Sequence, residues 1–310
     1  MRIMFMGTPE FANYSLDALV EEGYDVCAVV TQPDKPRGRG HNMAHPDVYL
    51  KAEEYNIPIY QPENLKRENF EDILTSVNPD IIVVTAYGKI LPEYVLNYPK
   101  YGCINVHGSL LPKYRGAAPM QWAIINGETK TGITIMYMEK GLDTGDMIIK
   151  EEVEITFDDT YETLHDKMAC LSKPVLIKAL RLIEEGKAER EKQDDRLSCY
   201  SPMIDKNTAK IDWTKSARDI SNLIRGLNPF PKAFTTFEGK GLKILRAFAI
   251  EKNYSGNPGE IIEVNKNSFV VSCGDNTFLE VLSIQPEGKR VMPVEEYLKG
   301  NRIEKNTYLG

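Results

Sequence analysis

Short apolar runs alternate with stretches that are apolar at helical spacing in the first third of the chain. Three of the runs are typical of buried strands: residues 2–6, 25–31 and 80–86. Three helical patterns accompany them: residues 10–22, 66–77 and 89–97. Strands that alternate with helices predict an α/β domain with a doubly wound, mainly parallel, Rossmann-like sheet. The near-continuous apolar character of the strands fits burial on both faces.

The rest of the chain follows two further patterns. Residues 131–138 and 146–154 are typical of strands, and a helix predicted at 160–185 follows them. Residues 187–208 are polar without periodicity, which predicts a linker. Beyond a helical pattern at 216–227, five short strands spaced by about 8–12 residues predict a small OB-like β-barrel: 233–238, 241–251, 259–265, 268–273 and 277–284. We therefore predict an N-terminal domain at 1–189, a linker at 190–208 and a C-terminal barrel domain at 209–310.

Ligands of parallel α/β sheets bind beyond the carboxyl ends of the strands. That rule selects the segments after Met6, Thr31 and Ala86, and the end of a strand at 103–106. A dinucleotide fingerprint needs three glycines after the first strand, and only Gly7 is present there. No Walker A motif occurs. NAD and nucleoside triphosphates are therefore not expected.

Two polar segments are candidates for chemistry. Asn105 and His107 lie two residues apart at a strand end, so they project from one face of the sheet. A histidine there is more often structural, but an asparagine beside it supplies a second N–H donor for an oxyanion. Asp143 lies in the run Gly-Leu-Asp-Thr-Gly-Asp, which is equally typical of a β-turn. The function of both segments stays open at this point.

A loop at 33–46 follows the second predicted strand and is rich in basic residues. Lys35, Arg37 and Arg39 are clustered in it, which suits phosphate contact, although a solvated surface loop is the simpler interpretation. His41 and His45 are four apart, but no third ligand is near them. We expect no metal site.

Composition and charge limit the partners. The 310 residues suggest two domains. The net charge of −7 argues against nucleic acid, but it divides into −10 for residues 1–199 (22 Lys and Arg, 32 Asp and Glu) and +3 for the remainder (16 and 13). Five widely spaced cysteines form no metal or disulfide pattern, and no signal or membrane segment is visible. A cytoplasmic protein with reduced thiols is expected.

Taken together, the motifs resemble the folate-dependent formyltransferases, and within them the methionyl-tRNA formyltransferases. The resemblance begins with Asn105-x-His107, Ser109-Leu-Leu-Pro112-x-x-Arg115-Gly116 and the run around Asp143. It extends to further segments along nearly the whole chain: Met6-Gly-Thr-Pro-Glu-Phe11, Thr31-Gln-Pro-Asp34, Ala86-Tyr-Gly88, Ile211-Asp-Trp213, Arg225-x-x-Asn228-Pro-Phe-Pro231 and Leu282-Ser-Ile-Gln-Pro-Glu-Gly288. The tail and the basic loop separate the members of this group better than the Ser-Leu-Leu-Pro core.

The resemblance implies a one-carbon transferase of translation initiation. It implies transfer of the formyl group of 10-formyltetrahydrofolate to the α-amino group of methionyl initiator tRNA, giving N-formylmethionyl-tRNA and tetrahydrofolate. Asn105 and a protonated His107 would stabilise the oxyanion, while Asp143 would hold His107 or a water and help to protonate the leaving nitrogen.

The binding residues are implied in the same way. The folate pocket would include Ser109, Leu110, Leu111, Pro112 and the segment after Ala86. Lys35, Arg37 and Arg39 would contact tRNA, and the barrel would hold the acceptor arm. The extra lysines of the family after Gly40 are replaced here by His41 and Asn42. No metal is implied, and the enzyme would be a monomer.

Three alternatives remain. A formyltetrahydrofolate deformylase would use the same Asn-His-Asp set, but that family carries a regulatory domain before the catalytic one, whereas this sheet begins at Arg2. A sugar-nucleotide N-formyltransferase would need neither the basic loop nor the segment at 228–231. An inactive RNA-binding protein on this scaffold would not need Asn105, His107 and Asp143.

Overall fold

The structure, a computed structural model, describes residues 1–37, 42–252 and 254–310. The chain forms two compact units. Unit 1 comprises Met1–Gly116, Thr131–Val153 and His165–Tyr200, and unit 2 comprises Ala117–Lys130, Glu154–Leu164 and Ser201–Gly310. This division differs from the predicted boundaries, because two short segments from the first half of the sequence pack with the C-terminal unit. The boundaries at 189 and 209 stay a prediction.

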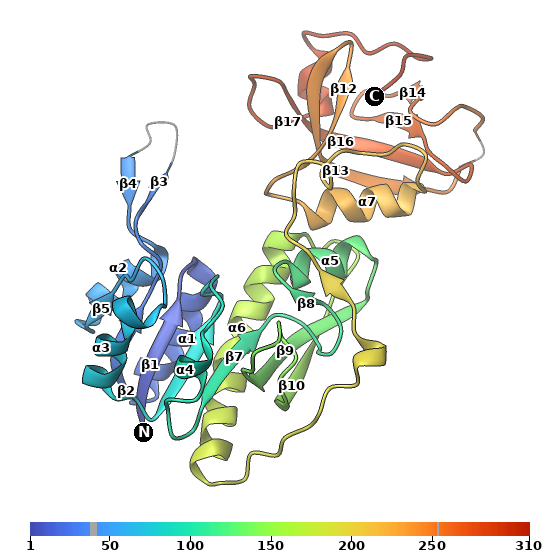
Figure 1. The fold of residues 1–310 in the computed structure, drawn as a ribbon. Coiled ribbons are helices and arrows are strands. Elements are labelled where there is room, and N and C mark those ends of the chain that lie inside the picture. Colours follow the sequence, from blue (N-terminus) through green and yellow to red (C-terminus); the bar gives the residue numbers. More distant parts are fainter. Residues whose placement is uncertain (38–41, 253) are drawn as a thin grey trace. The chain divides into compact units, whose positions relative to one another are not determined.

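A seven-stranded sheet forms the centre of unit 1 (Figure 1). Its strands run in the order β10 (Met147–Glu154), β9 (Lys130–Tyr137), β7 (Cys103–His107), β6 (Ile81–Thr85), β1 (Arg2–Gly7), β2 (Asp25–Val30) and β5 (Ile59–Tyr60). The pairs from β7 to β5 are parallel, and β9 runs antiparallel to β7. The predicted mainly parallel sheet is confirmed. The carboxyl ends of β1, β2, β6 and β7 therefore share one edge.

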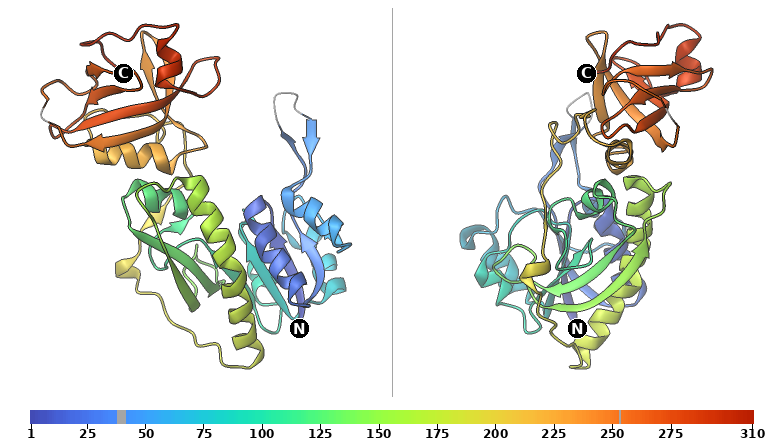
Figure 2. Two further views of the ribbon diagram at one scale, coloured as in Figure 1. Left: turned by 180° about the vertical axis from the view of Figure 1, so that it is seen from behind. Right: turned by 90° about the vertical axis from the view of Figure 1, so that its right-hand side faces the viewer.

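Both faces of this sheet are covered, which explains the continuous apolar strands. Residues 3–6 of β1 are all fully buried. On one face, Met4 and Met6 pack in a cluster with Phe70 and Leu74 of α3 (Arg67–Val77). The left view of Figure 2 shows α1 (Glu10–Glu21) and α6 (Tyr161–Glu184) side by side on one face.

Two segments of unit 1 depart from the sequence-based expectation. The helix predicted at 89–97 is only α4 (Glu93–Leu96), since the residue before Pro92 is disfavoured in helical conformation and Pro92 caps the helix. The loop predicted at 33–46 contains two antiparallel strands, β3 (Lys35–Arg37) and β4 (Asn42–Ala44), with Lys35 opposite Ala44. Two more elements follow that the pattern did not indicate: α2 (Asp47–Glu54) and β5.

Unit 2 is built on an antiparallel sheet, in agreement with the predicted short strands (Figure 1). The strand order is β12 (Ala233–Phe237), β13 (Lys240–Ile250), β16 (Phe278–Pro286), β15 (Phe269–Ser272) and β14 (Ile261–Val264), and β17 (Met292–Pro293) pairs with β16. Leu309 bridges to Phe237 of β12, while Tyr308 bridges to Glu260 beside β14. The last residues of the chain thus join both edges of the sheet. A short helix, α8 (Val294–Leu298), follows β17.

The two early segments of unit 2 are fixed to α7 (Ala217–Gly226). Gly226 lies so close to α5 (Pro119–Ile125) that a Cβ there would be 2.8 Å from Ile125 Cγ1. The Arg225 guanidinium donates to the carbonyl oxygens of Thr156 (3.4 Å) and Asp159 (3.1 Å). Because these contacts join residues far apart in sequence, the local hydrophobic pattern did not show that the two early segments belong to unit 2.

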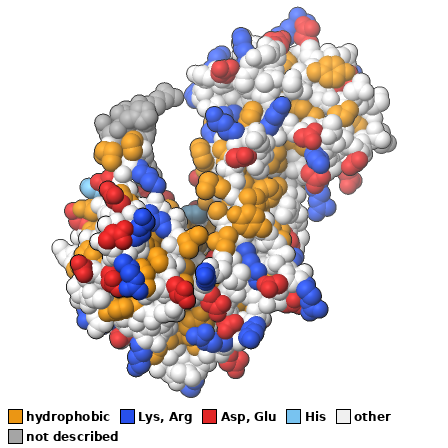
Figure 3. All heavy atoms as spheres, viewed as in Figure 1, with side chains coloured by type: hydrophobic (Ala, Val, Ile, Leu, Met, Phe, Trp, Pro, Cys, Tyr) orange, Lys and Arg blue, Asp and Glu red, His pale blue; other side chains and the backbone are white. Residues whose placement is uncertain are grey.

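Within the described residues, no helix is long and apolar enough to cross a membrane. On the face shown in Figure 3, basic and acidic side chains are interspersed over both units.

Candidate active site

Asn105 and His107 lie at the carboxyl end of β7, on the same face of the sheet, as their spacing predicts. Asn105 pairs in register with Val84 of β6 and Met136 of β9, and His107 is opposite Thr134. The His107 side chain is buried, with 5% of its surface exposed, whereas Asn105 is half-buried. The sheet therefore presents one ring and one carboxamide side by side at its functional edge.

Both nitrogens of the His107 ring face oxygen atoms. Nε2 lies 3.0 Å from the carbonyl oxygen of Tyr114, and Nδ1 lies 3.8 Å from Oδ2 of Asp143. A carbonyl only accepts hydrogen bonds, so Nε2 donates to Tyr114 and Nδ1 is the nitrogen that faces Asp143. The gap of 3.8 Å exceeds a direct hydrogen bond, so the pair can share a polar group of a substrate or a water between them.

Asp143 reaches this position from the turn between β9 and β10. Its backbone has a φ of 51°, in the left-handed region where aspartate is among the tolerated residues. The carboxylate oxygen Oδ2 accepts a hydrogen bond of 2.9 Å from the backbone N–H of Gly116. The turn interpretation and the functional interpretation of this segment are thus compatible, because the turn aims Asp143 at His107.

The segment after β7 divides into two kinds of residue. Ser109 is fully buried, and its hydroxyl donates to the carbonyl oxygen of Lys113 (2.7 Å). Leu111 is buried in a cluster with Met136 and Met147. Leu110 and Pro112 keep part of their surface exposed. Of the four residues predicted to bind folate, Ser109 and Leu111 thus have buried side chains, and Leu110 and Pro112 are partly exposed.

The loops after β1, β2 and β6 meet at the backbone of Tyr87. Its carbonyl oxygen accepts hydrogen bonds from Gln32 Nε2 (2.8 Å) and from the Thr8 hydroxyl (3.0 Å). Gly88 has a φ of 79°, and a Cβ there would lie 2.6 Å from Gln32 Nε2. Burial raises the pKa of Tyr87 to about 12. These contacts fix the segment after Ala86 at the edge where the sequence predicts a ligand.

The base of the β3–β4 hairpin is tied to the same edge. Gln61 Nε2 donates to the Gln32 carbonyl (2.9 Å) and to Asp34 Oδ1 (2.8 Å), and His45 Nδ1 is 2.9 Å from the same Asp34 oxygen. The hydrogen bonds from Gln61 and His45 lower the pKa of Asp34. The hairpin therefore starts from a hydrogen-bonded base.

The three basic residues predicted to contact tRNA are placed unequally. Lys35 Nζ donates to Gln32 Oε1 (2.7 Å). The backbone of Arg37 belongs to β3, and Arg39 lies outside the described residues. Lys89 lies close enough to Lys35 that the two positive charges repel, and burial followed by this repulsion lowers the pKa of Lys89.

One residue near Asp143 was missed by the sequence analysis. Gln193 lies in the predicted linker, yet its side-chain nitrogen donates to the carbonyl oxygens of Asp143 and Gly145, each at 2.8 Å. Arg115, which belongs to the motif after β7, donates to Gln193 Oε1. No local pattern in 187–208 marks Gln193, since the two carbonyls that it binds are about 50 residues away and Arg115 is 78 residues away.

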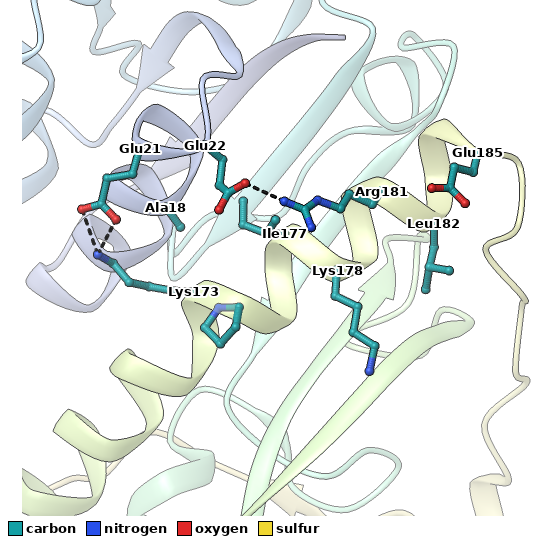
Figure 4. Close-up of a pocket in the computed structure, with 10 residues that line it drawn as sticks. Ala18, Glu21, Glu22, Lys173, Ile177, Lys178, Arg181, Leu182 and Glu185 are labelled. Atoms are coloured by element: carbon teal, nitrogen blue, oxygen red, sulfur yellow. Dashed lines mark hydrogen bonds and ion pairs between the residues drawn. The ribbon is translucent and has the colours of Figure 1, made fainter.

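A separate groove of about 560 Å³ lies between α1 and α6 (Figure 4). Ion pairs from Lys173 to Glu21 (3.1 Å) and from Arg181 to Glu22 (2.7 Å) join the two helices along it. It contains none of the predicted site residues. In the part of the chain that the structure describes, no group of three or more His, Cys, Asp or Glu side chains could hold a metal ion.

The chain matches two family models. The model described as formyl transferase matches residues 1–180, and the formyl transferase C-terminal domain matches residues 203–302. A protein of Acetivibrio thermocellus named methionyl-tRNA formyltransferase is 50% identical over 311 residues, covering all of both chains. A protein of Clostridioides difficile with the same name is 49% identical over 310 residues, again covering all of both chains.

Two solved structures illustrate the likeness of fold. A sugar 3N-formyl transferase solved in the presence of dTDP and 5-N-formyl-THF has a TM-score of 0.69 and 20% identity, covering 94% of this chain and 99% of that one. A methionyl-tRNA formyltransferase from Clostridium thermocellum has a TM-score of 0.54 and 18% identity, covering 80% of this chain and 92% of that one. At these identities the likeness concerns the fold alone.

Proposed function

The chain belongs to the formyl transferase family, and from that premise we propose that it formylates methionyl initiator tRNA with 10-formyltetrahydrofolate. Relatives that are about half identical over the full length carry the name methionyl-tRNA formyltransferase. The observation that carries the proposal is the group formed by Asn105, His107 and Asp143 at the carboxyl edge of the sheet. These side chains match the needs of formyl transfer to an amine.

The first step forms a carbon–nitrogen bond. The α-amino group of methionine must be neutral to attack, and such groups titrate near pH 8. Attack on the formyl carbon moves the carbonyl electron pair onto oxygen and gives a tetrahedral oxyanion. The Asn105 carboxamide and the His107 ring supply N–H donors for it, and one such donor contributes on the order of 10²–10³ in rate.

The second step breaks the bond to the folate nitrogen. The electron pair of that bond returns to the nitrogen, which takes up a proton, while the attacking amine loses one. Nε2 of His107 is occupied by the Tyr114 carbonyl, so the side of the ring that faces Asp143 is the one that can exchange a proton. We assign Asp143 and this side of His107 to the proton transfer.

We expect folate to bind to unit 1 alone and tRNA to contact both units. In the proposed complex, Ser109, Leu110, Leu111 and Pro112 form the folate site through their backbone and side chains, together with the segment after Ala86. Lys35, Arg37 and Arg39 contact the end of the tRNA. Unit 2 contacts the acceptor arm by shape and phosphates, as A-form RNA requires. The enzyme acts as a monomer in the cytoplasm and needs no metal.

The test offers 10-formyltetrahydrofolate to the purified chain with three acceptors: methionyl-tRNA, an amino-sugar nucleotide and water alone. We expect N-formylmethionyl-tRNA and stoichiometric tetrahydrofolate, detected by mass spectrometry. Faster formylation of the sugar would favour a sugar N-formyltransferase, and faster release of formate would favour a deformylase. Either result would overturn the proposal. His107→Ala serves as the control for adventitious transfer.

A further inference from the structure

We propose that Gln193 is a positioning residue for Asp143, and that Arg115 in turn fixes the orientation of Gln193. The inference rests on the proposed function for its kinetic consequences. Its structural basis is a closed circuit of hydrogen bonds that starts at Arg115, passes through Gln193 and Asp143, and returns to Gly116.

The Gln193 carboxamide holds the turn that carries Asp143. Both hydrogens of its nitrogen are used, because it donates to the carbonyls of Asp143 and Gly145 at 2.8 Å each. Gly145 also lies so close to β9 that a Cβ there would be 1.9 Å from the Tyr137 carbonyl oxygen. The turn that contains the left-handed backbone of Asp143 is therefore held by contacts with both Gln193 and β9.

Arg115 fixes which way the carboxamide points. Its Nε donates to Gln193 Oε1 at 2.9 Å, and its terminal nitrogen donates to Asp195 Oδ1 at 2.7 Å. A guanidinium only donates and a carbonyl only accepts, so reversing the amide of Gln193 would break three hydrogen bonds. Gln193 can satisfy Arg115 and the turn in one orientation only.

The circuit closes on the carboxylate itself. The backbone N–H of Gly116 donates to Asp143 Oδ2 (2.9 Å), and Gly116 directly follows Arg115 in the chain. The backbone and the carboxylate of Asp143 are thus both fixed relative to residues 115–116. Since the same carboxylate oxygen lies 3.8 Å from His107 Nδ1, the circuit sets the spacing of the proposed proton-transfer pair.

Segment 190–200 is anchored on both sides of Gln193. Glu191 and Met147 exchange backbone hydrogen bonds of 2.8 and 3.0 Å, and the Arg190 guanidinium lies 3.9 Å from the centre of the Tyr137 ring. On the other side, the Cys199 carbonyl accepts from the Arg115 backbone at 2.9 Å. This segment, predicted as a linker, therefore carries Gln193 at a defined place.

The kinetic test compares Gln193→Ala with Lys150→Ala. Lys150 contacts the same segment through an ion pair with Glu191 (3.0 Å) but does not touch the Asp143 turn. We expect Gln193→Ala to lower kcat about 10–100-fold with both KM values within about twofold, because a small displacement of a reacting group is costly. Lys150→Ala should retain wild-type kcat. An unchanged kcat in Gln193→Ala, or a loss that merely follows a lowered Tm, would overturn the proposal.

Two further variants separate orientation from space filling. Gln193→Glu keeps the size and the bond to Arg115 but places an oxygen against the two carbonyls, so we expect a loss at least as large as for Gln193→Ala. In an Asp143→Ala background, Gln193→Ala should cause no further loss, because the two residues act as one unit. If the losses of kcat in the two single variants multiplied in the double variant, Gln193 would act independently of Asp143.

The positioning role can also be measured without enzymatic turnover. Hydrogen exchange at the Gly116 amide reports its bond to Asp143. We expect about tenfold faster exchange there in Gln193→Ala and Gln193→Glu, and no change in Lys150→Ala. This result would support the positioning role even if the wild-type chain did not formylate tRNA. Unchanged exchange at Gly116 in both Gln193 variants would refute it.

Discussion

The proposed catalytic edge of unit 1 and the sheet of unit 2 are stabilised in different ways. At the proposed catalytic edge, the buried side chains of His107, Ser109 and Thr134 each make a hydrogen bond to a backbone carbonyl. In unit 2, apolar side chains such as Leu279 and Phe269 are fully buried in one large cluster. Directional bonds fix atoms in place, whereas burial of apolar surface is non-directional. We therefore expect substitutions at the proposed catalytic edge to lower kcat, and substitutions in the core of unit 2 to lower the free energy of unfolding.

The largest expected effect concerns the hydrogen-bonded groups at the proposed catalytic edge. We expect His107→Ala and Asp143→Ala each to lower kcat by about 10²–10³, because the proposed mechanism has both groups act on the transition state. Steady-state kinetics would measure the loss, and circular dichroism would check that the fold is intact. Wild-type rates in either variant would remove that residue from the mechanism.

The next effect concerns the apolar core of unit 2. Leu279→Ala removes a fully buried side chain of β16, and we expect a loss of about 2–5 kcal/mol in the free energy of unfolding. Urea denaturation would measure it. Under conditions where the variant stays folded, kcat should match the wild type. A lowered kcat without a lowered stability would contradict the contrast between the two regions.

A smaller effect concerns the segment around β3 and β4, which carries the residues proposed to contact RNA. We expect Arg39→Ala to raise the KM for methionyl-tRNA up to about fivefold, the effect of about 1 kcal/mol for one exposed charge. The KM for folate should stay unchanged. Lys35→Ala provides the comparison within the described residues, because Lys35 also bonds to Gln32. If the KM for folate rose more than that for tRNA, the hairpin would belong to the folate site.

The smallest effect concerns pH and the base of the hairpin. Hydrogen bonds from Gln61 and His45 lower the pKa of Asp34. The ionised carboxylate therefore stabilises the start of the β3–β4 segment at every pH above about 4, the ordinary pKa of an aspartate. That contribution should be lost as the pH falls through the lowered pKa. NMR signals of residues 35–37 and 42–44 should therefore shift between about pH 5 and 2. Asp34→Asn should abolish this shift, and its persistence would assign the transition to another group.

The strands of both sheets were predictable because their signals are local. The apolar runs at 2–6 and 25–31 correspond within a residue to β1 and β2. The resemblance to the formyltransferases is confirmed by the family models and the full-length relatives. In contrast, α5 and residues 154–164 could not be assigned to unit 2, since Arg225 and Gly226 hold them through contacts distant in sequence.

The candidate site divides along the same line. The sequence by itself determined that Asn105 and His107 share a face, because a strand alternates its side chains with a period of two. It also determined the family, because the motifs of that family are contiguous. Only the tertiary structure decided that Asp143 faces His107 and that Gln193 holds the Asp143 turn. Those placements depend on contacts between residues 36 and 50 positions apart, which no local pattern of apolar and polar positions records.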